Sequence, residues 1–392
     1  MSTPSRKPLT GASFDTLAVH AGEAADPATR AHNTPIYQTA TFSFETAEAK
    51  DEAVGHPWDA GSFFYSRVGN PTTAALEAKL AALDGGEAAV ASATGMSAIA
   101  ATLLSHLRAG QHLVVADDLF IGTQDLLSQD LPRLGIEVTA VPITDLDAVR
   151  AAVRPNTGAI FAEVLSNPWM RVTDVPALRT IADAAGALLV IDNTFLSPAV
   201  VRPLALGADL VVHATTKWVA GHGDALGGVV VGPEEKVAPV RVLTNNMGAA
   251  ASPFNSWLIA RGARTLHLRL ERASANATKL AAFLEAHPKV DWVRHPSLAS
   301  HPDQAVAQRV LTGLPGGMMA VKLLPGGSAD AVEAMHHFAN AFRTFGLAVS
   351  LGEVDTLVYP MASRGGIVRV SVGVESADDI IAEFSHSLDQ VP

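Results

Sequence analysis

The sequence predicts an α/β fold whose central sheet is mostly parallel and covered by helices on both faces. Between about residues 64 and 262, short continuous runs of valine, isoleucine and leucine alternate with segments that have the apolar spacing of helices. A sheet with one face in water would alternate apolar and polar residues, so uninterrupted apolar runs indicate strands buried on both faces. At 392 residues and 48% hydrophobic content, the chain is long enough for two or three domains.

The elements of this region follow one another in a regular order. TAALEAKLAAL (73–83) has the spacing of a helix, and VPALRTIADAAG (175–186) is a second helix that lies between strands. The expected strands are QHLVVADD (111–118), IEVTAVPI (136–143), TGAIFAEVL (157–165), ALLVIDNTF (187–195) and DLVVHATT (209–216). Strands joined through helices are typical of parallel pairing.

Two further parts are expected to flank this region. Residues 1–63 are rich in Thr, Pro and Ala with weak periodicity, which predicts an extended arm that needs another surface to order it. A long helix is expected to begin near Ser256, and a smaller α+β domain follows from apolar runs and helical patterns at 317–324, 329–342, 367–374 and 377–388. The predicted organisation is therefore an arm (1–63), an α/β domain (64–262) and a smaller domain (263–392).

Composition excludes several classes of protein. Asp plus Glu number 39 against 28 Lys plus Arg, a formal net charge of -11, and no basic block occurs, so no nucleic-acid partner is expected. The absence of cysteine excludes disulfides, thiolate metal ligands and a cysteine nucleophile. The start of the chain has no apolar run of about 7 to 15 residues, and no later run reaches about 18. We therefore expect a cytoplasmic protein that does not bind membranes.

Two polar residues end neighbouring predicted strands. Asp192 follows the run ALLVI, and Lys217 comes 217 − 192 = 25 residues later, after the run ADLVVHA. Ligands of open α/β sheets sit beyond the carboxyl ends of the strands. A desolvated lysine amine there could form a Schiff base with a carbonyl cofactor, and Asp192 would suit a pyridinium nitrogen. The alternatives are a solvated lysine at a strand end and a helix N-cap at Asp192.

Three other segments offer groups for an anionic ligand. Thr94 and Gly95 precede the helical segment SAIAATLLSHLRAG, whose free N–H groups and dipole suit a phosphate. Tyr65 and Arg67 offer a hydroxyl and a forked cation before another helix, although an exposed arginine in a turn is the alternative. Arg369 lies inside the apolar run GIVRVSVG, so we expect a carboxylate of the protein or of a substrate to pair with it.

Other catalytic motifs are incomplete. His336 and His337 are adjacent, and His213 and His222 lack partners at ligand spacing, so no metal site is expected and the histidines are interpreted as structural. The segment GMSAI lacks the last glycine of G-x-S-x-G, and GHGDALG has its third glycine one place late for G-x-G-x-x-G. A serine hydrolase and a nicotinamide dehydrogenase are both disfavoured.

Taken together, these features resemble the Cys/Met-metabolism family of pyridoxal phosphate enzymes over nearly the whole chain. The segments that carry the resemblance are YQTATF, FYSRVGNPT, LEAKLAALDGGEAA, TGMSAI, LSNP, VIDNTFLSP, PLALGADLVVHATTKWVAGHGD, RGARTLHLRL, SLGEVDTLV and VRVSVGVE. The resemblance implies a fold-type I enzyme with pyridoxal 5'-phosphate as its cofactor. It also implies a homotetramer, a dimer of dimers whose active sites are shared between subunits, which would give residues 1–63 a neighbouring subunit to contact.

The resemblance further implies roles for particular residues. Lys217 corresponds to the Schiff-base lysine, and Asp192 to the partner of the pyridinium nitrogen. The remaining cofactor contacts implied are Gly95, Met96, Thr194 and Thr216 from the same subunit, with Tyr65 and Arg67 reaching a neighbouring subunit's phosphate. Arg369, Ser350 and Asn167 resemble the groups that hold the substrate carboxylate.

The chain departs from the family at the position of a tyrosine that stacks over the cofactor and is often assigned as the acid for the leaving group. Here Phe120 occupies that position, so stacking is retained and the hydroxyl is lost. General acid catalysis contributes about 10² to 10⁴ in rate, so another donor is expected, with Tyr37, Tyr65 and Lys217 as candidates. Tyr37 is also counted among the substrate-binding residues.

The resemblance implies γ-elimination or γ-replacement on sulfur amino acids or O-acyl homoserines. Val349 stands where cystathionine enzymes commonly have a glutamate, which favours a small or apolar distal group. The alternatives are a cystathionine β- or γ-lyase, a specialised biosynthetic γ-substitution enzyme, and a protein that binds the cofactor without catalysis.

Overall fold

The central sheet of the computed structural model has seven strands in the order β1-β7-β6-β5-β4-β2-β3. The structure describes residues 9, 11–59, 61–311, 313–326 and 330–392. The strands are β1 (Ala88–Ser92), β2 (His112–Ala116), β3 (Glu137–Val141), β4 (Thr157–Glu163), β5 (Leu188–Asp192), β6 (Leu210–His213) and β7 (Gly228–Gly232). All pairs are parallel except those of β7, which runs antiparallel to both β1 and β6. The predicted, mostly parallel sheet is confirmed.

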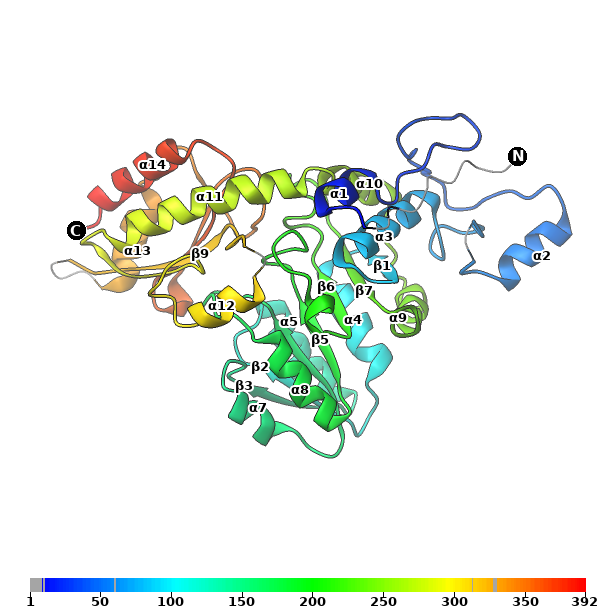
Figure 1. The fold of residues 1–392 in the computed structure, drawn as a ribbon, viewed down its shortest axis with the longest axis horizontal. Coiled ribbons are helices and arrows are strands. Elements are labelled where there is room, and N and C mark those ends of the chain that lie inside the picture. The colour runs from blue at the N-terminus through cyan, green and yellow to red at the C-terminus, as the bar shows by residue number, and fades with distance from the viewer. Residues whose placement is uncertain (1–8, 10, 60, 312, 327–329) are drawn as a thin grey trace.

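Helices cover both faces of this sheet (Figure 1). Those around it are α3 (Pro71–Asp84), α4 (Gly95–His106), α5 (Ile121–Asp125), α6 (Leu131–Arg133), α7 (Leu146–Ala152), α8 (Val175–Ala185), α9 (Glu234–Asn246) and α10 (Pro253–Ala263). In β7, Val229 and Val231 join the core that contains α3, whereas Val230 joins the main core with α4. Successive residues of one strand thus enter two different cores, which is why the strand sequence is apolar without alternation.

Strands β1 and β7 were not predicted from the sequence. The segment AAVAS of β1 contains one β-branched residue, and GVVVG of β7 is enclosed by glycines, so neither has a strong local strand pattern. The two strands pair with each other over five residues, and β7 also pairs with β6. These tertiary hydrogen bonds stabilise strands that have little intrinsic strand propensity.

A second sheet of five strands forms in the C-terminal part of the chain, in the order β10-β11-β12-β9-β8. Its strands are β8 (Val290–Arg294), β9 (Met318–Leu323), β10 (Gly346–Leu347), β11 (Leu357–Met361) and β12 (Ile367–Ser371), and its helices are α11 (Leu266–Glu285), α12 (Gln304–Val310), α13 (Ala331–Asn340) and α14 (Ala377–Asp389). The sheet, α11, α13 and α14 enclose a separate core (Figure 1). This is the expected α+β arrangement, although the exact domain boundary at 263 stays a prediction.

The long helix expected from near Ser256 is two helices, so that prediction was wrong. Helix α10 ends at Ala263 and α11 begins at Leu266, with Thr265 as its N-cap. The break is stabilised by Arg269, whose guanidinium donates to the carbonyl of Gly262 over 2.8 Å. The Arg269 side chain thus satisfies a carbonyl at the end of α10, so that this helix can end without a glycine cap.

The N-terminal segment is only partly the extended arm that the sequence predicts. It contains two short helices, α1 (Phe14–His20) and α2 (Ala47–Gly55). Helix α1 packs against α3 and α11, so it belongs to the body of the protein. Helix α2 has no buried residue and projects away from the rest of the chain (Figure 1). The boundary at residue 63 stays a prediction.

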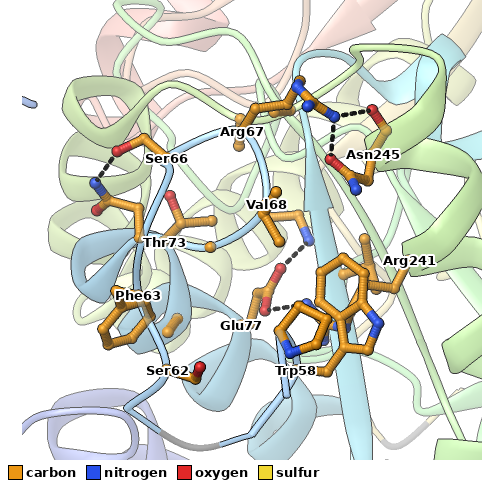
Figure 2. A pocket seen from close by; sticks show the side chains of 18 of the residues that line it. Trp58, Ser62, Phe63, Ser66, Arg67, Val68, Thr73, Glu77, Arg241 and Asn245 are labelled. Atoms are coloured by element: carbon orange, nitrogen blue, oxygen red, sulfur yellow. Dashed lines mark hydrogen bonds and ion pairs between the residues drawn. The ribbon is translucent and has the colours of Figure 1, made fainter. Parts of the chain in front are cut away.

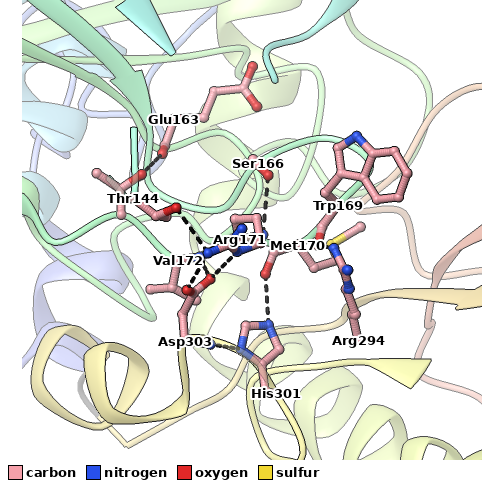
Figure 3. Close-up of polar contacts among 11 residues, drawn as sticks. Thr144, Glu163, Ser166, Trp169, Met170, Arg171, Val172, Arg294, His301 and Asp303 are labelled. Atoms are coloured by element: carbon pink, nitrogen blue, oxygen red, sulfur yellow. Dashed lines mark hydrogen bonds and ion pairs between the residues drawn. The ribbon is translucent and has the colours of Figure 1, made fainter. Parts of the chain in front are cut away.

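A polar network ties the loop after β4 to the start of α12 (Figure 3). Arg171 donates through Nε and Nη2 to the two carboxylate oxygens of Asp303, over 2.6 and 2.8 Å. The Val172 N–H donates to the same carboxylate over 3.0 Å, and Arg171 also donates to Thr144. Burial acts to raise the pKa of Asp303, but the hydrogen bonds from Arg171 and Val172 outweigh it and hold the pKa below 3.8.

Replacing Arg171 by alanine should lower the free energy of unfolding by about 2 kcal/mol at neutral pH, because the buried Asp303 loses a bidentate cationic partner. The folded-state pKa of Asp303 is depressed, so its stabilisation is present above the unfolded pKa and is lost as pH falls through the folded pKa. The difference between the two proteins should therefore shrink in acid. Urea unfolding at neutral and acidic pH measures both effects.

A matched control is Arg150→Ala, since Arg150 and its partner Asp147 are both exposed. That change should alter stability by less than about 0.5 kcal/mol. Equal losses in the two variants would contradict the role assigned to the Arg171 network.

Candidate active site

The main candidate site is a cavity of about 200 Å³ at the carboxyl ends of β4, β5 and β6. Its walls come from both sheets, since Val349 and Arg369 of the C-terminal part face residues of the central sheet. The predicted site residues that line it are Gly95, Met96, Phe120, Asn167, Asp192, Thr194, Thr216, Lys217, Val349 and Arg369. The tertiary fold thus brings together side chains that lie up to about 270 residues apart, at the edge where α/β sheets bind ligands.

Lys217 lies on a turn after β6 and directs its amine into this cavity. Its Nζ donates to Ser350 Oγ over 3.1 Å. The turn is held by Arg269, which donates to the carbonyls of Trp218 and Val219 over 2.7 and 3.3 Å. Burial lowers the pKa of the Lys217 amine, the Arg369 guanidinium lowers it further, and the Glu353 carboxylate opposes them. Lys217 is therefore partly buried with its ammonium form disfavoured, and its role as a nucleophile stays a prediction.

Asp192 ends β5 and is buried beside the same cavity. Its Oδ1 accepts a hydrogen bond from the Thr194 N–H over 2.8 Å. The next helical element begins only at Pro203, so the alternative that Asp192 is a helix N-cap was wrong. Burial raises the pKa of the Asp192 carboxyl, which the Thr194 hydrogen bonds and the charge of His213 oppose. A cation facing this carboxylate would stabilise its charged form.

The N-terminus of α4 forms another wall of the cavity. Thr94 caps the helix and accepts from the Ser97 N–H over 3.1 Å, while Ser97 Oγ accepts from the Thr94 N–H over 3.0 Å. A side chain at Gly95 would meet the Cβ of Ala214 at 2.6 Å, so only glycine allows the helix end to approach β6 this closely. Free N–H groups at such a helix end suit a phosphate.

Arg369 of β12 is buried and has no ion pair within the described part of the chain. Its guanidinium donates to the carbonyls of Val349 and Ser350 over 2.7 and 3.0 Å, and to Asn167 Oδ1 over 3.3 Å. The expectation of a protein carboxylate as hydrogen-bonded partner was therefore wrong, because main-chain carbonyls take that place. Burial lowers the pKa of Arg369 to about 10. A substrate carboxylate would supply the missing opposite charge.

The outer part of the cavity is apolar. Phe120, Leu226 and Val349 line it and are 44%, 59% and 73% exposed. Three large apolar side chains at the mouth of a cavity favour an apolar ligand group there. Leu226 was missed by the sequence reasoning, because it lies in an irregular segment between the Lys217 turn and β7 and has no local signal.

Three predicted site residues do not reach this cavity in a single chain. Tyr37 donates its hydroxyl to Asp26, and this hydrogen bond raises the pKa of Tyr37 to about 12. Arg67 lines a second pocket (Figure 2), where it donates to Asn245 Oδ1 over 2.7 Å, and it lies 5.4 Å from the ring centroid of Tyr65. The two pockets share no lining residue. The interpretation that Tyr65 and Arg67 serve a neighbouring subunit stays a prediction.

Two titratable residues of the site were also missed by the sequence reasoning. Glu163 ends β4 and lines the cavity beside Asp192, and Arg269 holds the Lys217 turn from α11. Glu163 lies inside the apolar run TGAIFAEVL, where an unpaired carboxylate would be costly, so the sequence held a signal for it of the same kind as that for Arg369. Arg269 lies inside a helix among other charged residues, so no local signal separates it from a surface arginine.

The groups that line the cavity fit pyridoxal 5'-phosphate. The Lys217 amine, the Asp192 carboxylate and the α4 N-terminus offer an amine for the carbonyl group, a charge for the ring nitrogen and donors for the phosphate. Phe120 supplies an apolar ring in the same cavity. The fold and this set of groups define a pyridoxal-phosphate-dependent enzyme of fold type I.

The chain belongs to the family of Cys/Met metabolism PLP-dependent enzymes, whose model matches residues 15–389. It is 39% identical over 405 residues to L-methionine gamma-lyase of Porphyromonas gingivalis, covering 98% of this chain and 99% of that protein. It is 40% identical over 387 residues to cystathionine gamma-synthase of Mycobacterium tuberculosis, covering 95% and 96%. The solved structure of cystathionine gamma-lyase from Lactobacillus plantarum complexed with L-serine has a TM-score of 0.88 at 34% identity, covering 97% of this chain and 99% of that chain.

No group of three or more His, Asp or Glu side chains in the described ranges could hold a metal ion. None of the described helices is long and apolar enough to cross a membrane.

Proposed function

We propose that this enzyme catalyses γ-elimination or γ-replacement on sulfur amino acids or O-acyl homoserines. The observation that carries the proposal is that the Lys217 amine and the unpaired Arg369 guanidinium face one cavity whose mouth is apolar. An α-amino acid bound with its carboxylate on Arg369 would place its side chain toward that mouth. The relatives named for methionine and cystathionine chemistry support the same substrate class.

Four polar side chains of the cavity have definite tasks in this reaction. Arg369 binds the substrate carboxylate, with Asn167 and the segment around Ser350 fixing the guanidinium. Pyridoxal phosphate withdraws electrons from the α-carbon, so that a substituent further along the side chain can leave. Lys217, with its lowered pKa, takes the proton from the α-carbon and can return it to a neighbouring carbon. Asp192 provides a negative charge for the ring nitrogen.

The apolar mouth favours a methionine-like thioether or an O-acyl group over cystathionine. The distal end of cystathionine carries an ammonium and a carboxylate, which Leu226 and Val349 would desolvate without a polar partner. A cystathionine β- or γ-lyase and a specialised γ-substitution enzyme remain the alternative candidates. A protein that binds the cofactor without catalysis would have no use for the unpaired Arg369, and the family consists of enzymes.

A substrate panel tests this proposal. Purified holoenzyme is mixed with methionine, cystathionine and O-acyl homoserines, with and without a thiol, and 2-oxo acid and new thioether are measured. We expect turnover with methionine or an O-acyl homoserine and a lower kcat/KM with cystathionine. Preference for cystathionine would overturn the substrate assignment, and turnover of none would overturn the proposed activity.

The second part of the proposal is that two subunits share each active site, within a homotetramer. Tyr65 and Arg67 are exposed, and neither lines the cavity that contains Lys217. The same N-terminal region exposes Ile36 and Trp58, which favours burial against another subunit. A cytoplasmic location likewise stays a prediction, based on composition.

Complementation tests the sharing of sites. Arg67→Ala and Lys217→Ala should each be nearly inactive alone, because one lacks a phosphate contact and the other the catalytic amine. Co-expressed subunits should regain part of the activity, since one site of a hybrid dimer combines an intact Lys217 with an intact Arg67. Co-expression of Lys217→Ala with Arg133→Ala, an exposed arginine, provides the reference. Hybrids without any regained activity would contradict shared sites.

A further inference from the structure

Glu163 is a buried carboxyl group of the active-site cavity to which the proposed reaction assigns no task. It is the last residue of β4, is 6% exposed, and lines the cavity that also contains Lys217 and Arg369. In the parallel pairing of β4 with β5 its register partner is Asp192. Paired residues of neighbouring strands point to the same face, so the two carboxyl groups lie side by side.

One oxygen of Glu163 anchors the residue that replaces the stacking tyrosine. The Phe120 N–H donates to Glu163 Oε1 over 2.7 Å. The Phe120 ring itself is 44% exposed, so packing alone fixes it weakly. Phe120 immediately precedes α5, and that helix contributes no side-chain cap at its start. The bond to Glu163 holds the N–H of the residue that carries the ring, while the Phe120 carbonyl accepts from the Gln124 N–H over 2.9 Å in the first turn of α5.

The other oxygen of Glu163 is buried without a hydrogen-bond partner. The negative charges of Asp192 and Asp118 disfavour its ionised form, whereas the Asn167 N–H and the Arg369 guanidinium of β12 favour it. Asp192, in contrast, accepts hydrogen bonds from Thr194, and the charge of His213 stabilises its ionised form. Two adjacent buried carboxyl groups do not both ionise, so the proton resides on the one with fewer stabilising contacts.

We propose that Glu163 is a positioning residue that stays protonated, holding the main chain of Phe120 at the cofactor site while leaving Asp192 as the charged carboxylate of the pair. Burial and the neighbouring Asp192 charge raise the pKa of Glu163 well above its ordinary value, in agreement with this assignment. A protonated Glu163 avoids a second negative charge next to the ring nitrogen. The inference rests on the cofactor site of the proposed function.

The first test observes the proton directly. Difference infrared spectroscopy of the wild type against Glu163→Gln, at neutral pH and with or without cofactor, should show the carbonyl band of a protonated carboxylic acid. The control is Glu383→Gln, because Glu383 is also buried but accepts from Thr344 over 2.7 Å and lies 3.5 Å from Arg343, so it should show only carboxylate bands. Absence of an acid band assignable to Glu163 would overturn the inference even if the enzyme turns over its substrates.

The second test separates position from charge. Glu163→Gln keeps an acceptor for the Phe120 N–H and is neutral. The midpoint of the pH titration of the bound-cofactor absorbance should therefore be unchanged, and kcat should stay within about twofold of wild type. Glu163→Leu removes the acceptor, and we expect an altered visible circular dichroism of the cofactor and a kcat lower by about tenfold. A shifted cofactor titration in Glu163→Gln would mean that Glu163 is ionised. Wild-type dichroism and kcat in Glu163→Leu would refute the positioning role. If that variant fails to fold, Glu163→Met, which also lacks the carboxyl acceptor and is closer in shape to glutamate, takes its place with the same expected results.

Discussion

Replacing Lys217 by alanine should abolish the covalent attachment of the cofactor and reduce turnover by at least about 10² to 10⁴. The change removes the amine that faces the cavity and donates to Ser350, and the described structure offers no second lysine among the lining residues. The visible absorption of purified protein and the release of 2-oxo acid measure the two effects. Full turnover in the variant would refute the role of Lys217.

The same variant should change how the stability of the cofactor-free protein depends on pH. The folded-state pKa of Lys217 is lowered from 10.5, so between the folded and unfolded pKa values the unfolded chain binds more protons. Wild-type stability therefore rises with pH through that window, and this contribution should be missing in Lys217→Ala. Lys279→Ala, at an exposed position of α11, is the control and should keep both the contribution and the cofactor.

Replacing Phe120 by tyrosine should raise the rate of C–S cleavage, by up to about 10² to 10⁴ if the leaving group lacks an acid in the present enzyme. The ring lines the cavity and its main chain is held by Glu163, so a hydroxyl added to it should enter the space where the leaving group departs. Steady-state kcat with methionine, as a function of pH, measures the gain. The hydroxyl should add an acidic group to the profile and leave cofactor affinity nearly unchanged.

Phe345→Tyr, on a partly buried ring that packs on Phe342 in the C-terminal core, is the matched control and should leave kcat unchanged. If Phe120→Tyr gives no gain with any sulfur substrate, the leaving group already has a donor or needs none. Among the donors that the sequence suggests, Tyr37 is a poor one where it lies, because its hydrogen bond to Asp26 raises its pKa to about 12. Lys217 then becomes the main candidate.

The elements that sequence reasoning predicted correctly are those with strong local patterns. Strands β2, β4, β5 and β6 are mostly apolar runs, and α3, α4 and α8 have helical spacing with capping residues at their starts. The failures have a tertiary cause. Strands β1 and β7 depend on each other for pairing, and the break between α10 and α11 depends on Arg269 reaching back to Gly262.

The sequence alone determined the fold class, the family resemblance and the placement of Lys217, Asp192 and Gly95 at strand or helix ends, because those signals are local along the chain. Only the tertiary structure decided which groups share a cavity. It placed the unpaired Arg369 opposite Lys217, set Glu163 beside Asp192, and left Tyr37, Tyr65 and Arg67 outside. The physical reason is that burial, electrostatic partners and register across strands are properties of segments far apart in the chain, which no local pattern encodes.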